Sequence, residues 1–393
     1  MDLTSQVSLG KAVARERKLA GQTQAQLAIG INYSESHVKK VEQEKEPASP
    51  AFVAAVARYL KIEPGVITSV PLRHDDEPPL QGVAELQAIL AEGKYVRPDP
   101  PGTLAELSKA VEDAHANYYG DKGKEALAAL PRILRQLYGA IVAESGANRL
   151  RASFLLNRSW YLAERISRRF GYRSMVTAII DRMESSADQA EDPLCVAQAL
   201  TQRAHALMYY GDNDAGLGMV DRATGLVTDR TESGLCVLGA ATLSGAIISA
   251  RKGQLDTALE YIKDARLLAA RVKGESPLYG TLFGSGNVDI HYFGALMEGG
   301  DPDRAAREGA SLVFPPGVSA PRKGRHYQDQ ARAWVLAGKP QEALRALNLA
   351  RKIAPEQTRA HPQVLETARA IARLEKRRTD SLANFSGWLG VKL

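Results

Sequence analysis

The sequence of 393 residues predicts an all-α protein, in which a small N-terminal helical domain precedes a long array of helical hairpins. Two short amphipathic stretches flank a tight turn near the N-terminus. From Thr103 onward, apolar residues recur at helical spacing. Turns interrupt this pattern about every 40 residues, as in repeat proteins, and they lie near Asp121, Gly171, Gly211, Gly253, Gly300 and Gly338.

Length and composition limit the class of protein. A chain of this length holds more than one core or one extended array. We find no apolar stretch of the roughly 20 residues that cross a bilayer, and the start of the chain lacks the basic and apolar regions of a secretion signal. Cys195 and Cys236 each lie in an apolar helical pattern, which predicts buried, reduced thiols. These features predict a cytoplasmic protein without a membrane partner.

The first of the two N-terminal stretches has the signals of a short helix. Thr23 is a hydroxyl N-cap, and Gln26, three residues later, suits a capping box. Leu27 and Ala28 give the helix a small apolar face. Asn32 stands where the chain must reverse, and asparagine tolerates positive φ better than other non-glycine residues.

The second stretch, Ser34 to Glu42, predicts a helix with two distinct faces. Ser34 is its N-cap, and Val38 and Val41 form the inner face at i, i+3 spacing. The outer face carries polar and charged side chains: Glu35, Ser36, Lys39 and Lys40. A short helix with this face suits the major groove of DNA.

Together these stretches resemble the helix-turn-helix of XRE-type regulators, the Cro and phage-repressor family. The likeness runs from about Leu9 to Ile67 and includes five helices. It implies that Arg17 and Glu42 form a structural ion pair, and that Val41 and Glu44 depart from the aromatic residue and the glycine common in the family. It also implies a surface that binds double-stranded operator DNA, made of Thr23, Gln24, Ser34, Glu35, Ser36, His37, Lys39 and Lys40.

The charge of this domain predicts a dimer. The whole chain carries a net charge of +6, but residues 1–70 hold nine Lys and Arg against seven Asp and Glu. So small an excess predicts weak DNA binding by one copy and favours a homodimer on paired half-sites.

Changes in composition divide the chain. Residues 1–69 form the predicted helix-turn-helix domain, and residues 70–102 form a linker. Proline-rich breaks at 70–79 and 98–102 flank one short helix, Val83 to Glu92. Residues 103–393 form the array, with a capping helix at Ala360 to Lys376 and a last turn packed through Phe385, Trp388 and Leu389.

The array resembles degenerate tetratricopeptide repeats, although a generic array of helical hairpins also fits. Ala258 and Ala265, like Ala343 and Ala350, recur seven positions apart and allow close helix packing. In such repeats the first helices line a concave groove. That register implies ligand contacts by Arg158, Tyr161, Arg165, Gln198, Thr201, His205, Tyr209, Asn287, His291, Gln328 and Arg332.

Motifs for catalysis are missing from the sequence. Gly-Lys is never followed by Ser or Thr, so there is no P-loop. There is no His-Glu-x-x-His, and the seven histidines lack the spacing of metal ligands. We therefore expect no enzyme activity, no cofactor and no metal.

Two functions remain open. The order of the parts resembles Rgg, PlcR and Rap-related quorum-sensing regulators, and also long actinobacterial XRE regulators. This resemblance implies a transcriptional regulator whose array binds a signalling peptide or a small molecule. The alternative is a DNA-localised scaffold whose array docks a partner protein.

Overall fold

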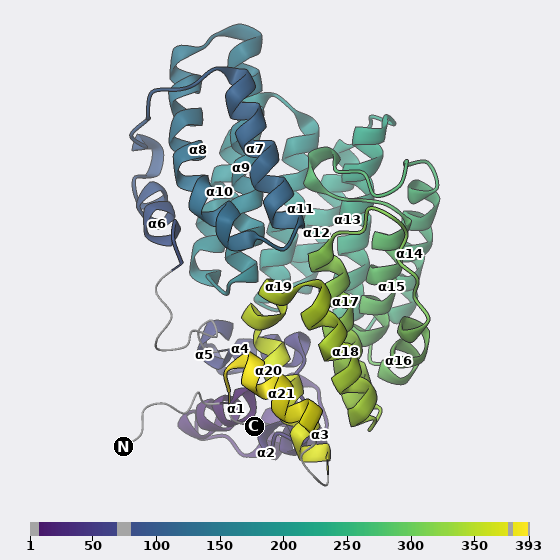
Figure 1. The fold of residues 1–393 in the computed structure, drawn as a ribbon. Coiled ribbons are helices and arrows are strands. Elements are labelled where there is room, and N and C mark those ends of the chain that lie inside the picture. Colours follow the sequence, from purple (N-terminus) through teal and green to yellow (C-terminus); the bar gives the residue numbers. More distant parts are fainter. Residues whose placement is uncertain (1–7, 69–79, 376–379, 392–393) are drawn as a thin grey trace.

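The structure, a computed structural model, describes residues 8–68, 80–375 and 380–391. Within these ranges every regular element is a helix, and Ser276 and Phe283 form one isolated β-bridge. The predicted all-α fold is confirmed. Figure 1 shows a small N-terminal domain beneath a larger stack of helices, with the C-terminal helices beside it.

The N-terminal domain, here called the head, has a core of its own. Leu27, Val38, Phe52 and Ile67 are fully buried in it. Gly10 allows a close approach of the first and third helices, because a Cβ there would lie 2.2 Å from the carbonyl oxygen of Val41. The helices of the head are α1 (Leu9–Leu19), α2 (Gln24–Ile31), α3 (Glu35–Glu42), α4 (Pro50–Leu60) and α5 (Pro64–Thr68). The sequence predicts the first helix from about Ser5 to Ala20, and the part of that range before Ser8 lies outside the described residues.

Six helical hairpins form the array. Each pairs two successive helices that pack directly on one another. The bounds of the pairs are α7 (Leu104–Tyr119) with α8 (Gly123–Ala143), α9 (Gly146–Arg169) with α10 (Arg173–Ala190), α11 (Pro193–Tyr209) with α12 (Asn213–Leu226), α13 (Glu232–Arg251) with α14 (Leu255–Ala269), α15 (Ser285–Glu298) with α16 (Pro302–Ala310), and α17 (Ala320–Leu336) with α18 (Pro340–Ile353).

The turns inside the hairpins fall at the six predicted positions. Each contains a residue with φ between 65° and 88°, in the left-handed region. Five of these residues are glycines, which adopt that region without steric cost. The sixth is Asp121, and aspartate is one of the few other residues that visit it.

The short helix α6 (Val83–Ala91) packs as part of the array, although we expected it to lie within a linker. Its residues Val83, Leu86 and Ile89 are buried, and the helix contacts α8 and α10. A 3₁₀ turn, η1 (Gly93–Tyr95), follows. The proline-rich stretch at 70–79 lies outside the described residues.

The C-terminal helices complete the array. They are α19 (Pro355–Ala360), α20 (Pro362–Leu374) and α21 (Asp380–Leu389). Helix α20 corresponds to the expected capping helix, and Phe385 and Leu389 are buried with it against α17 and α18. Trp388 is partly buried, with its ring 5.5 Å from that of Phe385.

The last part of the array contacts the first hairpin. The Asp121 carboxylate accepts bonds from the backbone N–H groups of Glu356 and Gln357 at 2.8 and 3.1 Å. The Glu356 carboxylate in turn accepts from the N–H of Gly123 at 2.6 Å, at the start of α8. The Arg169 guanidinium lies 3.7 Å from Asp121 and 3.9 Å from Glu356. We call these three side chains the clasp, because they close the array into a ring.

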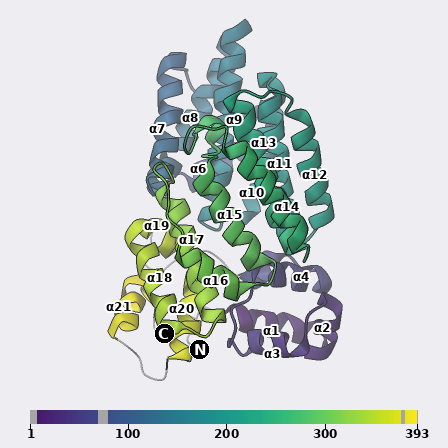
Figure 2. The same ribbon diagram turned by 90° about the vertical axis from the view of Figure 1, so that its right-hand side faces the viewer.

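The head rests on two separate parts of the array. Arg58 Nη1 donates to the carbonyl of Gly211, in the α11–α12 turn, at 2.8 Å. At the other side, the Arg373 guanidinium on α20 binds the carbonyl and the carboxylate of Glu44. Figure 2 shows the head beside α20 and beneath the ends of the array helices.

Two interior helices require a correction to the sequence analysis. By length and composition alone, α8 and α13 are apolar enough to cross a membrane, whereas we expected no such stretch. In the fold, α8 packs against α7 and α9, and 78% of the apolar window of α13 is buried. Buried core helices can have the same length and apolar composition as a membrane-spanning helix. Cys195 and Cys236 are free and buried.

Candidate nucleic-acid interface and ligand cavity

Helix α3, the second helix of the expected helix-turn-helix, presents a polar face to solvent. Asn32 takes the left-handed conformation with φ 58° and reverses the chain before α3. The Ser34 hydroxyl then accepts a bond from His37 N–H at 3.1 Å and caps the helix. Val38 and Val41 are buried in the head. The exposed side chains, which we call the recognition surface, are Ser34, Glu35, Ser36, Lys39 and Lys40.

A buried ion pair fixes α3 against α1. Arg17 donates to both carboxylate oxygens of Glu42, at 2.6 and 2.8 Å, and both side chains are almost fully buried. Gln24 Nε2 donates to the same carboxylate at 2.8 Å. Thr23 and Gln26 form both bonds of a capping box at the start of α2. Gln24, an expected DNA contact, is thus held at the N-terminus of α2, while Thr23 beside it is exposed.

Glu46 binds two residues of α3. It accepts from Lys40 Nζ at 2.6 Å and lies 3.0 Å from His37 Nδ1. The His37 ring also stacks on Tyr33 and meets Phe52 edge-on. The His37 ring therefore packs against neighbouring side chains of the head. Lys39, by contrast, has no ion pair with any residue that the structure describes.

The backbone at the end of α3 bears on one departure from the expected helix-turn-helix pattern. Glu44 stands where a glycine is common, and its φ of 58° lies in the left-handed region that glycine favours. Its carboxylate and carbonyl are held by Arg373. The contact between Glu44 and Arg373, which joins the head to the array, therefore follows the recognition surface directly in the sequence.

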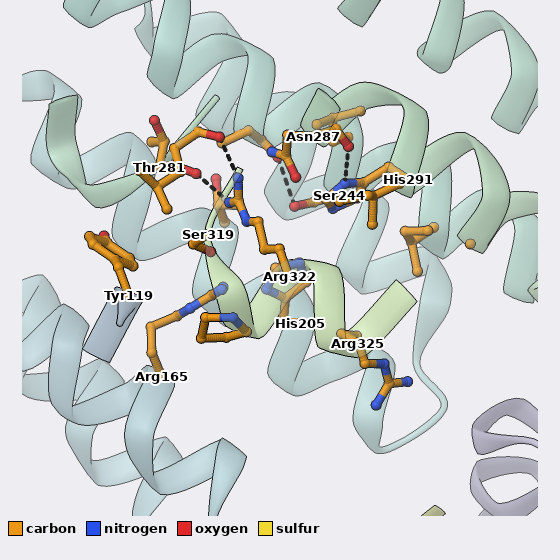
Figure 3. Close-up of a pocket in the computed structure, with 18 of the residues that line it drawn as sticks. Tyr119, Arg165, His205, Ser244, Thr281, Asn287, His291, Ser319, Arg322 and Arg325 are labelled. Atoms are coloured by element: carbon orange, nitrogen blue, oxygen red, sulfur yellow. Dashed lines mark hydrogen bonds between the residues drawn. The ribbon is translucent and has the colours of Figure 1, made fainter. Parts of the chain in front are cut away.

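The array surrounds a half-open cavity of about 280 Å³. The first helix of every hairpin contributes to its lining, and α19 adds Gln357. Figure 3 shows Arg165 from α9 and Arg322 from α17 approaching the same space, with His205 and His291 nearby. The closed ring thus turns the expected groove into a pocket.

The charged side chains that line the cavity are mainly cationic. They are Arg165, Arg322, Arg325 and one acid, Asp329. Asp329 is already bound to Arg325 at 2.8 Å. The Arg322 guanidinium donates to the carbonyls of Thr281 and Leu282. Burial, together with the nearby Arg165, lowers the pKa of Arg322.

Three further titratable groups in the cavity, His205, His291 and Tyr119, favour their neutral forms. Burial lowers the pKa of His291 to about 4, and it holds that of His205 well below its ordinary value. Burial also raises the pKa of Tyr119 to about 12. At neutral pH the positive charge in the cavity therefore comes from its arginines.

Six of the expected ligand residues meet at this cavity: Tyr161, Arg165, Thr201, His205, Asn287 and His291. Five do not line it. Gln198 binds the carbonyl of Tyr279, and Arg158 Nη1 lies close to Gly280. Tyr209 lines a smaller pocket. Gln328 donates to Thr358 at 3.1 Å, and Arg332 pairs with Glu298 at 3.4 Å.

Sequence reasoning missed several polar lining residues, among them Tyr119, Arg322, Arg325 and Asp329. The stretch Pro321-Arg-Lys-Gly-Arg325 is a visible basic cluster at the start of α17. That cluster was the available signal for Arg322. Tyr119 ends α7, in the first hairpin, whereas the expected ligand residues begin only at Arg158.

No group of three or more His, Cys, Asp or Glu side chains suited to a metal ion occurs among residues 8–68, 80–375 and 380–391.

Comparison with known proteins gives little. No protein-family profile and no curated protein sequence matches the chain. Among solved structures it is similar to Bacillus thuringiensis PlcR in complex with the peptide PapR7 and DNA, at 12% identity over 95% of this chain and 100% of that one, with a TM-score of 0.29. It is also similar to a mutant of PrgX, at 12% identity over 97% and 100%, with a TM-score of 0.31. Likenesses this weak carry no conclusion about function.

Proposed function

We propose that this protein is a DNA-binding transcriptional regulator whose array senses a signalling ligand, a peptide or a small molecule. The observation that carries the proposal is the recognition surface. It combines exposed polar and lysine side chains with a rigid support, the buried Arg17–Glu42 pair. A capped helix with these features can enter a major groove and contact base edges.

A homodimer is the form that we expect on DNA. The head alone has a small positive excess, so phosphate attraction to one copy is weak. Two heads on paired half-sites would double both the phosphate contacts and the base contacts.

The contacts between head and array suggest how a ligand acts. Gln357 on α19 lines the cavity, and α20 follows directly. From α20, Arg373 binds Glu44 next to the recognition surface. A ligand that favours one position of α19 and α20 would therefore favour one position of the head. Such a shift requires that the ligand bind the two positions with different affinity.

The test is fluorescence anisotropy of the full chain on DNA from upstream of its own gene, at several salt concentrations. We expect the double variant Lys39→Ala with Lys40→Ala to lose sequence-preferring binding by at least about tenfold, since each base contact contributes roughly 1–3 kcal/mol.

The matched control is Lys263→Ala with Lys273→Ala, because both lysines are exposed on the array. It changes charge by the same amount and should keep specific binding. Unchanged operator affinity in the Lys39 and Lys40 variant would remove the recognition-surface assignment.

A further inference from the structure

The α14–α15 connection runs inside the array and occupies part of its inner face. Residues 276–283, here called the inner loop, have four successive carbonyl groups that accept bonds from groove side chains. Gln198 donates to Tyr279, and Tyr119 donates to Gly280 at 2.9 Å. Arg322 donates to the carbonyls of Thr281 and Leu282. The chain itself thus makes the main-chain contacts that an extended peptide would otherwise make there.

The space that remains is small. Pockets that hold drug-sized ligands measure roughly 300–1,000 Å³, and this cavity, at about 280 Å³, lies just below that range. An extended peptide of seven residues would be about 24 Å long. With the inner loop in place, the cavity suits a small molecule better than such a peptide.

Two polar groups in the cavity lack partners. Arg165 has no hydrogen bond or ion pair with any described residue, and its guanidinium lies 5.9 Å from the Tyr161 ring centroid. The Asn287 carbonyl oxygen Oδ1 is buried without a hydrogen bond, and Asn287 is 2% exposed. Because Asp329 is paired with Arg325, no free carboxylate lines the cavity near Arg165 and Arg322.

An unpaired, partly buried guanidinium is costly, and an anion bound to it would offset that cost. Arg165 keeps its full planar fork of donors, which matches a carboxylate. The α13 and α15 walls add Leu243, Ile247 and Ile290, which suit an apolar body.

We propose that the cavity binds a small organic anion with an apolar body, whose charged group lies against Arg165 and Arg322. This inference rests on the proposed function in one respect, namely that the bound anion acts as a signal. Binding itself does not require DNA.

The experiment uses the full-length protein and three probes with the same tail: octanoate, octanol and octylamine. Isothermal titration calorimetry gives the Kd, and thermal unfolding gives the shift in Tm. We expect octanoate to bind at least about tenfold more tightly than octanol, as a charge-assisted bond to a partly buried arginine implies. Octylamine should not bind. Octyl phosphate serves as a fourth probe, and tighter binding than octanoate would identify the anionic group as a phosphate.

The variants Arg165→Gln and Arg322→Gln should each weaken octanoate at least about tenfold. Arg345→Gln, the same change at an exposed position, should not. Circular dichroism and a cooperative thermal unfolding transition verify that each variant is folded. If one of the two cavity variants fails to fold, the octanoate affinity of the other tests the proposal. Arg165→Lys should retain part of the affinity for octanoate.

Three results would overturn the inference: octanoate and octyl phosphate bind no better than octanol, octylamine binds as well as octanoate, or both glutamine variants keep full affinity. If these occur while specific DNA binding persists, the small-anion site fails and the regulator stands. If octanoate binds as expected but DNA binding is absent, the site stands and the regulator fails.

Discussion

The head and the cavity differ in how far apart along the chain their residues lie. The recognition surface and its supporting ion pair come from residues 17–42. The cavity draws on residues from Tyr118 to Gln357. A local site is specified by caps, turns and helical spacing, whereas a dispersed site depends on how the whole array closes. The predictions below test this difference.

The largest effect should follow from Arg17→Ala. Removing one partner of a buried ion pair leaves the other charge unpaired and costs about 3–5 kcal/mol. We expect the head to lose most of its stability while the array keeps its own unfolding transition, since the two have separate cores. Urea unfolding followed by circular dichroism and DNA binding measures both.

Arg15→Ala is the matched control for this prediction. Arg15 pairs with Glu16 on the surface at 2.7 Å and is 50% exposed, so its loss should cost less than about 1 kcal/mol. If Arg17→Ala also lowered the stability of the array, the head would not be a local unit.

A smaller effect is expected at the clasp. Glu356→Ala removes the acceptor for the N–H groups of Gly123 and Lys124 and should cost about 1–2 kcal/mol, as the loss of a helix cap does. Hydrogen exchange should become faster in α19 and at the start of α8, while the head is unaffected. Glu125→Ala, an exposed change on α8, is the control. Equal exchange in the two variants would show that the clasp does not close the array.

The smallest effect concerns pH. The pKa of His291 is about 4, because burial, Arg322 and Arg165 outweigh its bond to Asn287. Between the ordinary histidine pKa and about 4, the unfolded chain binds a proton that the native state does not. Stability of the array should therefore fall as pH is lowered from about 6.5 towards 4.

His291→Gln should make this loss shallower, with urea midpoints from pH 7.5 to 4.5 as the measurement. Burial raises the pKa of Asp121 and of Glu356, and these raised pKa values increase the stability of the array as pH falls. Because this effect opposes that of His291, variant and wild type are compared at each pH. His37→Gln in the head is the control. An identical pH dependence in His291→Gln and wild type would contradict the neutral, buried state of His291.

The sequence predicted those features that depend on local chemistry. The six turn positions could be read from the sequence because glycine or aspartate recurs between the helical stretches. In the structure each of these residues has a positive φ. The cap at Ser34 and the reversal at Asn32 followed from residue type and spacing. The pairing of Arg17 with Glu42 followed from the resemblance to a known domain.

Long-range packing could not be predicted in the same way. Nothing near Tyr279 indicates that its loop folds inward and covers Arg158 and Gln198. The pairing of Asp121 with the start of α19 joins positions that no local pattern relates. The apolar face of α6 was visible, but the prolines on both sides favoured a linker. Arg322 was missed because its role depends on the inner loop.

The clasp also bears on the order in which the parts form during synthesis. The head is complete by residue 68, but Asp121 meets its partner only when residue 356 has been made. At 5–20 residues per second, that is roughly 15–60 s later. A nascent chain therefore carries a folded head well before its cavity exists. If the proposed function holds, such a chain would reach DNA before it could respond to a ligand, and the closing of the array would be the step that makes it responsive.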